Sequence, residues 1–394
     1  MKAVILAAGK ATRTYPLTIT TPKPLLMILN KTIIEHNLDQ LTGLVNEVII
    51  VVGFMQEKIK QHLGDQYKSI KITYVEQKQQ LGTANALLAA EHFVDNRFIV
   101  LYGDDLYSGK DLKQLAKHEY AAIAKKVEEP SRFGVFIGKK DRLDNIVEKP
   151  KQFISDLANI GCYLLDNKIF AIIKNLKKSA RGELELTDAI NQLAKSVDFT
   201  VVQSTDYWLP IAYWWNYLEA NVFMLNQIEK SNIQGQVEDN VTIKGILVLG
   251  KDSVIKSGTY IEGPVYISNN CEIGPNAFLR KDTIIMEGVR TRAEIVDSVI
   301  LRGTTAKHQC YIGHSVIGNH CNIAYGTVTA DFRHDGKNHI TVINGNKIDT
   351  GRRKLGACLG DNVNTGINTG IYPGRKIWPN KTTLPGEIVE KDIE

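Results

Sequence analysis

The 394-residue sequence is poor in cysteine, and its five cysteines include no closely spaced pair. Their odd number leaves at least one without a partner in the chain. This pattern argues against a disulfide framework, and the simplest interpretation is a reduced, cytoplasmic protein. The cysteines are Cys162, Cys271, Cys310, Cys321 and Cys358.

Long apolar runs and an excess of one charge are lacking as well. The N-terminal apolar run is too short for a signal peptide, because it ends at Ala8 and Lys10 follows closely. No segment approaches the length of a membrane span. The net charge is only +5, and no dense block of Lys and Arg marks a nucleic-acid footprint. The nearest block, Arg352-Arg353-Lys354, suits a phosphorylated small ligand better than a duplex. We therefore expect no membrane and no nucleic-acid partner.

An aliphatic residue recurs at every sixth position through part of the C-terminal half. A period of six fits neither a helix nor an alternating strand, and it predicts a hexapeptide β-helix. In such a coil each aliphatic side chain points inward from a short strand, and a corner follows. The aliphatic positions are Ile243, Leu249, Ile255, Ile261, Ile267, Ile273, Leu279 and Ile285. The turn formers that come three residues later are Asp252, Gly258, Pro264, Asn270, Asn276, Asp282 and Gly288.

The repeat is interrupted and then resumes near the C-terminus. Residues 330–357 depart from it altogether, so we expect them to leave the coil as a loop, where chemistry is commonly placed on a rigid solenoid. A generic β-sandwich is disfavoured, since it would show period-two alternation. The imperfect positions are Ile295, Leu301, Ile317 and Ile323, and the resumed ones are Leu359, Thr365, Ile371, Ile377 and Thr383.

The N-terminal half alternates predicted strands with predicted helices, as a doubly wound α/β domain does. A chain of this length is expected to form two domains. Helical spacing from 216 to 230 predicts a helix that connects them, and the coil is expected to start near Val237. The predicted strands are 3–6, 48–52, 70–75 and 98–102, and the predicted helices lie around 32–44, 55–63 and 82–92.

Several motifs occur in an order that resembles the sugar-1-phosphate nucleotidylyltransferases. They are L-A-A-G-K-A-T-R at 6–13, P-L-T at 16–18, T-P-K-P-L at 21–25, Q-K-Q-Q-L-G-T at 77–83, Y-G-D at 102–104, E-K-P at 148–150 and N-I-G at 159–161. Together with the hexapeptide repeat, nearly the whole chain resembles the archaeal bifunctional sugar-1-phosphate nucleotidylyltransferase and amino-sugar-1-phosphate acetyltransferase. The resemblance implies a Rossmann-like nucleotidyltransferase domain (1–221), a connecting helix (222–236) and a left-handed parallel β-helix that is acyltransferase-like (237–394).

For the first half, the resemblance implies attack by a sugar-1-phosphate oxygen on the α-phosphorus of a nucleoside triphosphate, with release of pyrophosphate. The sugar would be glucose or N-acetylglucosamine and the nucleotide UTP or dTTP. Such a reaction depends on positioning and charge neutralisation. Arg13 and Lys23 are the implied catalytic cations, and Asp104 the implied Mg²⁺ ligand. The implied nucleotide-binding residues are Leu6, Ala7, Ala8, Gly9, Gln77, Gly82, Thr83 and Gly103, and the implied sugar-phosphate residues are Gly134, Glu148, Lys149 and Asn159.

For the second half, residues 307–318 resemble the H-x-x-Y-x-G-D-x-x-I-G segment of the acetyltransferase. His308 would accept a proton from the amino group that attacks acetyl-CoA, a role suited to imidazole. The remaining implied residues of this site are Arg280, Tyr311, Asp331, Lys337, Arg352, Arg353 and Lys354. The family also implies a homotrimer. A zinc site formed by His308, His314 and His320 is disfavoured, because residues one rung apart lie on different sides of a coil.

Five positions depart from the family pattern. Ala11 replaces a glycine, which ordinary backbone angles would tolerate and a positive φ would not. Pro210 stands where a second metal-binding Asp is usual, and His314 where another Asp is usual. Tyr325 replaces a small residue beside acetyl-CoA. Asp331 replaces an Asn near the sugar's amine, and its carboxylate would hold that amine charged and non-nucleophilic. Two alternatives stay open: a nucleotidylyltransferase whose coil only trimerises, and a non-catalytic regulatory subunit that binds the same ligands.

Overall fold

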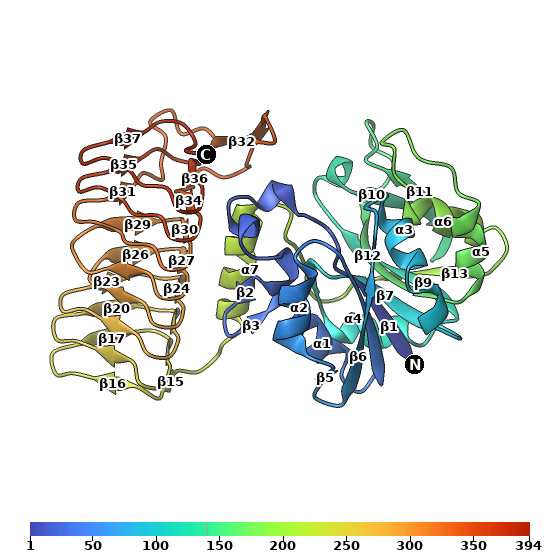
Figure 1. Ribbon diagram of the computed structural model, residues 1–394, viewed down its shortest axis with the longest axis horizontal. Helices are drawn as coiled ribbons and strands as arrows, with labels where there is room; N and C mark the ends of the chain where they lie inside the picture. The colour runs from blue at the N-terminus through green and yellow to red at the C-terminus, as the bar shows by residue number, and fades with distance from the viewer. Residues whose placement is uncertain (140) are drawn as a thin grey trace. The chain divides into compact units, whose positions relative to one another are not determined.

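The computed structural model describes residues 1–139 and 141–394, and it divides into two compact units. The first unit comprises Met1–Lys10, Pro22–Leu26 and Thr32–Pro210. The second comprises Ala11–Thr21, Met27–Lys31 and Ile211–Glu394. Figure 1 labels the helices and strands of both. Within the described residues, no helix combines the length and the apolar character needed to span a membrane.

A ten-stranded sheet forms the centre of the first unit, in the order β10-β11-β13-β9-β12-β7-β1-β4-β6-β5. Strand β1 runs parallel to both β4 and β7, and β4 runs parallel to β6. These four strands confirm the four predicted from the sequence. The strands of the sheet are β1 (Lys2–Leu6), β4 (Glu47–Val52), β5 (Gln66–Tyr67), β6 (Ile70–Glu76), β7 (Phe98–Tyr102), β9 (Tyr120–Lys126), β10 (Gly134–Lys139), β11 (Arg142–Glu148), β12 (Leu157–Leu165) and β13 (Phe199–Gln203).

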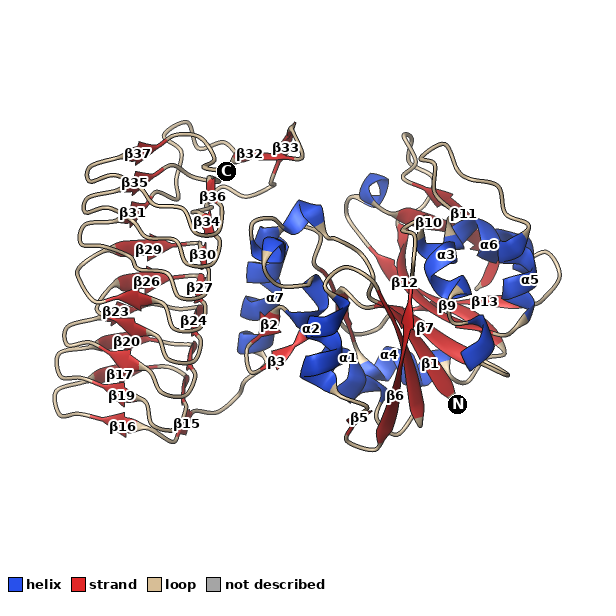
Figure 2. Ribbon diagram, viewed as in Figure 1, coloured by secondary structure: helices blue, strands red, loops and turns tan. Residues whose placement is uncertain are grey.

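Helices cover both faces of this sheet (Figure 2). Alternate residues of β1 enter opposite cores: Val4 packs in one buried cluster and Ile5 in the other. A parallel sheet buried on both faces requires the continuous apolar strands that the sequence shows. The predicted helix at 82–92 is shorter, because α3 ends at Leu88 and a 3₁₀ turn follows. The helices of this unit are α1 (Ile33–Leu41), α2 (Gln56–Leu63), α3 (Thr83–Leu88), α4 (Gly109–Leu115), α5 (Lys168–Lys174) and α6 (Leu186–Leu193).

The second unit is a coil of three parallel sheets that the chain visits in turn, an arrangement consistent with a parallel β-helix. The first sheet contains β15 (Asn232–Ile233), β18 (Leu247–Leu249), β21 (Val265–Ile267), β24 (Thr283–Ile285), β27 (Ser298–Ile300), β30 (Val316–Ile317), β34 (Cys358–Leu359) and β36 (Lys376–Ile377). The second contains β16 (Gln236–Val237), β19 (Val254–Ile255), β22 (Glu272–Ile273), β25 (Arg290–Thr291) and β28 (Thr305–Ala306). The third contains β17 (Thr242–Lys244), β20 (Tyr260–Glu262), β23 (Phe278–Leu279), β26 (Glu294–Val296), β29 (Tyr311–Gly313), β31 (Val328–Thr329), β35 (Gly370–Ile371) and β37 (Ile388–Val389).

The predicted inward positions from Leu249 to Ile285 lie in the buried core of the coil. Except at Pro264, their corners adopt a left-handed backbone, for example Asn270 (φ 57°) and Asn276 (φ 56°), which only Gly, Asn and Asp adopt readily. The prediction for Leu301 was wrong, because its neighbour Ile300 occupies the core instead. The cause is a shortened turn of the coil: Ile285 pairs with Ile300.

Residues 330–357 leave the coil as predicted, since Ile317 pairs directly with Leu359. The segment is more ordered than a loop, because it contains the antiparallel hairpin of β32 (Ile340–Ile343) and β33 (Asn346–Asp349). The predicted connecting helix is α7 (Trp214–Asn226), which packs beside β24, β27 and β30. The coil starts earlier than expected, at β15 rather than near Val237.

Candidate functional site

In the first unit, the carboxyl ends of β1 and β7 bring the glycine-rich segment and the Y-G-D motif together. The Gly103 amide donates a hydrogen bond of 2.9 Å to the carbonyl of Leu6. Ala7 and Ala8 continue β1 and are buried, and Gly9 follows with open space around its α-carbon. Ligands of open α/β sheets bind at this edge of parallel strands. The structure therefore brings Leu6 to Gly9 and Gly103 together at this edge of the sheet.

A buried lysine and a half-exposed aspartate meet at this edge. Lys23 is only 4% exposed, and its Nζ lies 2.7 Å from Oδ2 of Asp104. The Asp104 side chain is 42% exposed, so the carboxylate remains open to a ligand. Burying a charged group without a partner is costly, and the carboxylate offsets that cost for Lys23. The ion pair fixes the ammonium group of Lys23 in position at this edge of the sheet.

The Q-K-Q-Q-L-G-T motif joins the same edge. The amide of Gln77 is buried and donates to the carbonyl of Gly82 (3.2 Å) and to Oδ1 of Asn85 (2.9 Å). Thr83 Oγ1 accepts a hydrogen bond from the Leu186 amide at 3.0 Å. Sequence reasoning missed Gln80, whose Nε2 donates to the carbonyl of Ala8 at 2.8 Å. That bond fastens the motif to the end of β1.

Three of the four predicted sugar-phosphate residues lie together. A β-carbon on Gly134 would come within 2.8 Å of Oε2 of Glu148 and 3.7 Å of the β-carbon of Asn159. The Nδ2 of Asn159 donates to the hydroxyl of Tyr163 at 2.7 Å, which fixes its amide. Burial raises the pKa of Glu148, although the charge of Arg181 opposes the shift. Lys149 adopts a left-handed backbone (φ 45°) immediately after Glu148.

Pro210 occupies the position where a second metal-binding carboxylate was expected. Strand β14 (Trp208–Pro210) pairs with β8 (Asp105–Tyr107) and sets Pro210 opposite Asp105. Oδ2 of Asp105 accepts a hydrogen bond from the indole of Trp208 at 3.1 Å. Asp104 retains a partly exposed carboxylate of the kind that Mg²⁺ prefers, and Mg²⁺ commonly keeps water and phosphate ligands. Asp104, which also pairs with Lys23, would therefore supply one carboxylate to Mg²⁺, and water and phosphate oxygens would supply the other ligands.

Arg13 and Ala11 belong to the second unit. The guanidinium of Arg13 lies 5.9 Å from the ring centroid of Tyr213, which also belongs to that unit. Ala11 has φ 51° and ψ 47°, so the condition of ordinary backbone angles, under which an alanine would be tolerated there, is not met. The family's glycine would adopt this conformation without strain. Alanine is strained there, because its β-carbon comes too close to the backbone.

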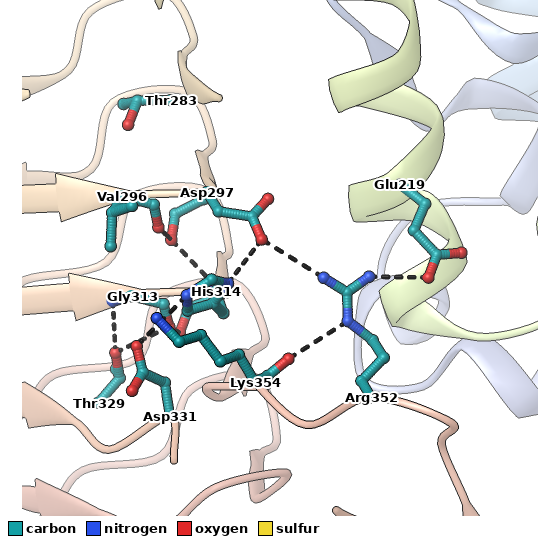
Figure 3. A network of polar contacts seen from close by, with 12 residues as sticks. Glu219, Thr283, Val296, Asp297, Gly313, His314, Thr329, Asp331, Arg352 and Lys354 are labelled. Atoms are coloured by element: carbon teal, nitrogen blue, oxygen red, sulfur yellow. Dashed lines mark hydrogen bonds and ion pairs between the residues drawn. The ribbon is translucent and has the colours of Figure 1, made fainter. Parts of the chain in front are cut away.

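In the second unit, four of the predicted or flagged side chains form one polar network with two carboxylates that sequence reasoning missed (Figure 3). The hydroxyl of Tyr311 donates to Oδ2 of Asp331 at 2.8 Å. The ring of His314 lies between Asp331 and Asp297, and Arg352 contacts Asp297 and Glu219. Asp297 sits at a left-handed corner (φ 42°), where an Asp is read as a turn former rather than a site residue.

The other predicted residues of this half lie outside the network, except that the backbone carbonyl of Lys354 accepts a hydrogen bond from Nε of Arg352 at 3.4 Å (Figure 3). His308 is exposed, and its ring faces Tyr325 with the centroids 6.5 Å apart. Arg280 pairs with Glu294 at 3.2 Å, and Nε of Arg353 donates to the carbonyl of Gly336 at 2.9 Å. Lys337 and Lys354 are exposed. Arg352 contacts two carboxylates, so a phosphate would have to compete with them for its guanidinium.

Comparison with known proteins agrees with this geometry. Residues 2–227 match the family model of the nucleotidyl transferases, and residues 259–384 match that of the GMPPB C-terminal domain. A solved structure of UDP-glucose pyrophosphorylase complexed with UDP-glucose is similar, with a TM-score of 0.54 and 26% identity. The similarity covers 58% of this chain and 99% of that one. The fold and the site thus define a nucleotidyl transferase.

Two relatives match over the full length. The bifunctional protein GlmU of Methanococcus maripaludis is 39% identical over 100% of this chain and 96% of its own. The bifunctional sugar-1-phosphate nucleotidylyltransferase/acetyltransferase of Sulfurisphaera tokodaii is 40% identical over 100% of this chain and 98% of its own. The chain belongs to this family of bifunctional sugar-1-phosphate nucleotidylyltransferase/acetyltransferase enzymes.

Proposed function

We propose that the first half couples glucose-1-phosphate or N-acetylglucosamine-1-phosphate to UTP or dTTP, forming a nucleotide sugar and pyrophosphate. The observation that carries this proposal is the ion pair between Lys23, in the 3₁₀ turn Lys23–Leu25, and Asp104, which follows β7. Two anions must be held in line for the sugar phosphate to attack the α-phosphorus, and a buried cation lowers their mutual repulsion. No covalent enzyme intermediate is required.

Each predicted residue has a role in this reaction. Lys23 neutralises charge between the two phosphates, and Arg13 binds the leaving pyrophosphate. Glu148 and Asn159 bind the sugar, and Gln77 and the backbone of Gly82 frame the base. Asp104 would hold Mg²⁺, which supplies further charge neutralisation when bound. We also propose the predicted order of a nucleotidyltransferase domain, a connecting helix and a coil domain, with the helix placed at α7 (Trp214–Asn226) and the start of the coil at β15 (Asn232–Ile233).

A second activity is proposed for the coil, which we infer to be a left-handed β-helix that forms trimers. The observation that favours it is the ionisable network around Tyr311 and Asp331, at the base of the segment that leaves the coil. A coil that served only to trimerise would have no need of this network. In the proposed reaction an amino-sugar phosphate accepts the acetyl group of acetyl-CoA, and His308 acts as the base.

The first activity is tested by pyrophosphate release with Mg²⁺, comparing glucose-1-phosphate and N-acetylglucosamine-1-phosphate with UTP and dTTP. Lys23→Ala is expected to lower kcat about 100-fold or more, because a charge-neutralising contact to the transferring phosphate is lost. Lys113→Ala is the matched control, since Lys113 is an exposed lysine on α4. Equal rates for the two variants would contradict the role of Lys23.

The second activity is tested by thiol release from acetyl-CoA with glucosamine-1-phosphate. His308→Ala should lower the rate about 100-fold, since a general base contributes on this order. His334→Ala is the control, because His334 is another exposed histidine of the same unit. Thiol release that is absent from the wild type, with pyrophosphate release intact, would favour a coil that only trimerises.

A further inference from the structure

The imidazole of His314 is enclosed by two carboxylates (Figure 3). Its Nδ1 lies 2.6 Å from Oδ2 of Asp297, and its Nε2 lies 3.5 Å from Oδ2 of Asp331. All three side chains are largely buried, with exposures of 12%, 17% and 15%. Neither the family pattern nor the relatives' names assign a role to this histidine.

The geometry determines how protons are shared in the cluster. An ionised carboxylate only accepts hydrogen bonds, and both ring nitrogens donate only when the imidazole carries two protons. Nδ1 of His314 is hydrogen-bonded to Oδ2 of Asp297, and a protonated ring would also form an ion pair with Asp331 across 3.5 Å. Arg352 adds a second positive charge, with its Nη2 3.3 Å from Oδ2 of Asp297.

Asp331 therefore differs from an isolated carboxylate in having two neighbours that stabilise its negative charge. It is faced by His314 and accepts a hydrogen bond from the hydroxyl of Tyr311 at 2.8 Å. Burial and this bond to Asp331 raise the pKa of Tyr311, which keeps the phenol a donor. The cluster packs tightly, since a β-carbon on Gly313 would lie 2.6 Å from the Tyr311 hydroxyl and 2.7 Å from Oδ2 of Asp331.

We propose that His314 is a positioning residue that balances the charge of Asp331, so that Asp331 binds the acceptor's amine in its neutral, nucleophilic form. This inference rests on the acyltransferase function proposed above. A lone carboxylate would stabilise the ammonium form of the amine. The pair of Asp331 and His314 has no net charge and offers the amine a hydrogen-bond acceptor, as an amide would. The amine then loses its proton to the general base when it attacks the thioester carbon and the thiolate of CoA leaves.

The other charged groups around the cluster have partners of their own. Arg352, which bridges Asp297 and Glu219, and the pair of Arg280 and Glu294 beside Tyr311 are each partnered by opposite charge. Nε2 of His339 donates a hydrogen bond to the backbone carbonyl of Asp331 (2.9 Å), and burial lowers the pKa of His339. His314 is thus the cation that faces the Asp331 carboxylate among the ion pairs of the described residues.

The test is the pH dependence of kcat for acetyl transfer to glucosamine-1-phosphate, which reports groups in the enzyme–substrate complex, in the full-length wild type and in His314→Asn. Asn is chosen because His314 has φ 50°, a left-handed conformation that Asn tolerates. The acidic limb of the profile should move upward by about one pH unit, and kcat at pH 7 should fall about tenfold. The double variant His314→Asn/Asp331→Asn should regain most of this loss, since it removes both charges.

Asp297→Asn gives an independent test if the first variant folds poorly. Asp297→Asn removes the carboxylate that stabilises the protonated form of His314. The acidic limb of the pH profile should therefore also move upward. Pyrophosphate release should be unchanged in all of these variants. An unshifted profile in both single variants, or a double variant no better than His314→Asn, would overturn this inference alone. Absence of acetyl transfer by the wild type would instead overturn the proposed acyltransferase function, and this inference with it.

Discussion

At the scale of single residues, Ala11 is a strained position. Its φ of 51° places an L-residue with a β-carbon in the left-handed region. We expect Ala11→Gly to raise the free energy of unfolding by about 0.5–1 kcal/mol, the relief of strain less the greater entropy of glycine in the unfolded chain. Urea denaturation measures the change. Ala116→Gly is the matched control at φ −62°, and it should be destabilising. Destabilisation by Ala11→Gly would contradict the assignment of strain.

A second residue-scale prediction concerns Glu35 and His62, whose side chains lie 3.3 Å apart. Burial opposes the shift, but hydrogen bonds from His62 and Thr32 lower the pKa of Glu35 to about 2. The hydrogen bond to Glu35 raises the pKa of His62. Stabilisation through Glu35 is lost as the pH falls from 4.5 towards 2, and stabilisation through His62 is lost as the pH rises above 6.5.

The pair of Glu35 and His62 should therefore stabilise the protein most between pH 4.5 and pH 6.5, the ordinary pKa values of the two side chains. We expect His62→Gln to destabilise by less than about 1 kcal/mol near pH 5.5, since the imidazole is partly exposed, and by less still at pH 8.5. Urea denaturation at the two pH values checks this. A larger effect at pH 8.5 would show that His62 acts through packing rather than charge.

At the scale of elements, the corners of the coil determine where each strand ends. Asn276 is exposed and left-handed (φ 56°), so replacing its side chain chiefly changes the backbone preference. Asn276→Ala should cost about 1 kcal/mol more than Asn276→Gly, because alanine is strained at that angle and glycine is not. Thermal denaturation of the two variants measures the difference. Equal stabilities would mean that the corner relaxes.

The elements that follow local rules could be predicted from the sequence. The run from Leu249 to Ile285 and its Asn, Asp and Gly corners follow from side-chain size and backbone preference, and both are local properties. Leu301 could not be placed, because a shortened turn changes which neighbour faces inward and the pairing of Ile285 with Ile300 is not local. The hairpin within residues 330–357 was missed for a similar reason, since its short strands carry no strong alternation.

The sites could be predicted where a motif is contiguous and not where partners come from distant segments. Lys23 and Asp104 are far apart in sequence, and the family motifs alone indicated that they share a site. Asp297 and Glu219 were missed, because a turn aspartate and a helical glutamate give no signal until the coil and α7 bring them to Arg352. Gln80 was missed although its motif was identified.

At the scale of the whole molecule, the chain combines two units with separate chemistry. The first has the charged pair and strand ends of a nucleotidyl transferase, and the second has an ionisable cluster on a regular coil. The relatives that match along the full chain are named for two activities. The central claim is that the first unit forms a bond between a sugar phosphate and the α-phosphorus of a nucleotide.

The most direct measurement is ³¹P NMR of a reaction with UTP, glucose-1-phosphate and Mg²⁺. The account predicts that the signal of the sugar phosphate disappears while a nucleoside diphosphate sugar and free pyrophosphate appear in equal amounts. The same reaction with dTTP and N-acetylglucosamine-1-phosphate identifies the preferred pair, and Lys23→Ala should leave the spectra nearly unchanged over the same time. Binding of the nucleotides without any new phosphorus signal, or orthophosphate as the product, would contradict the claim.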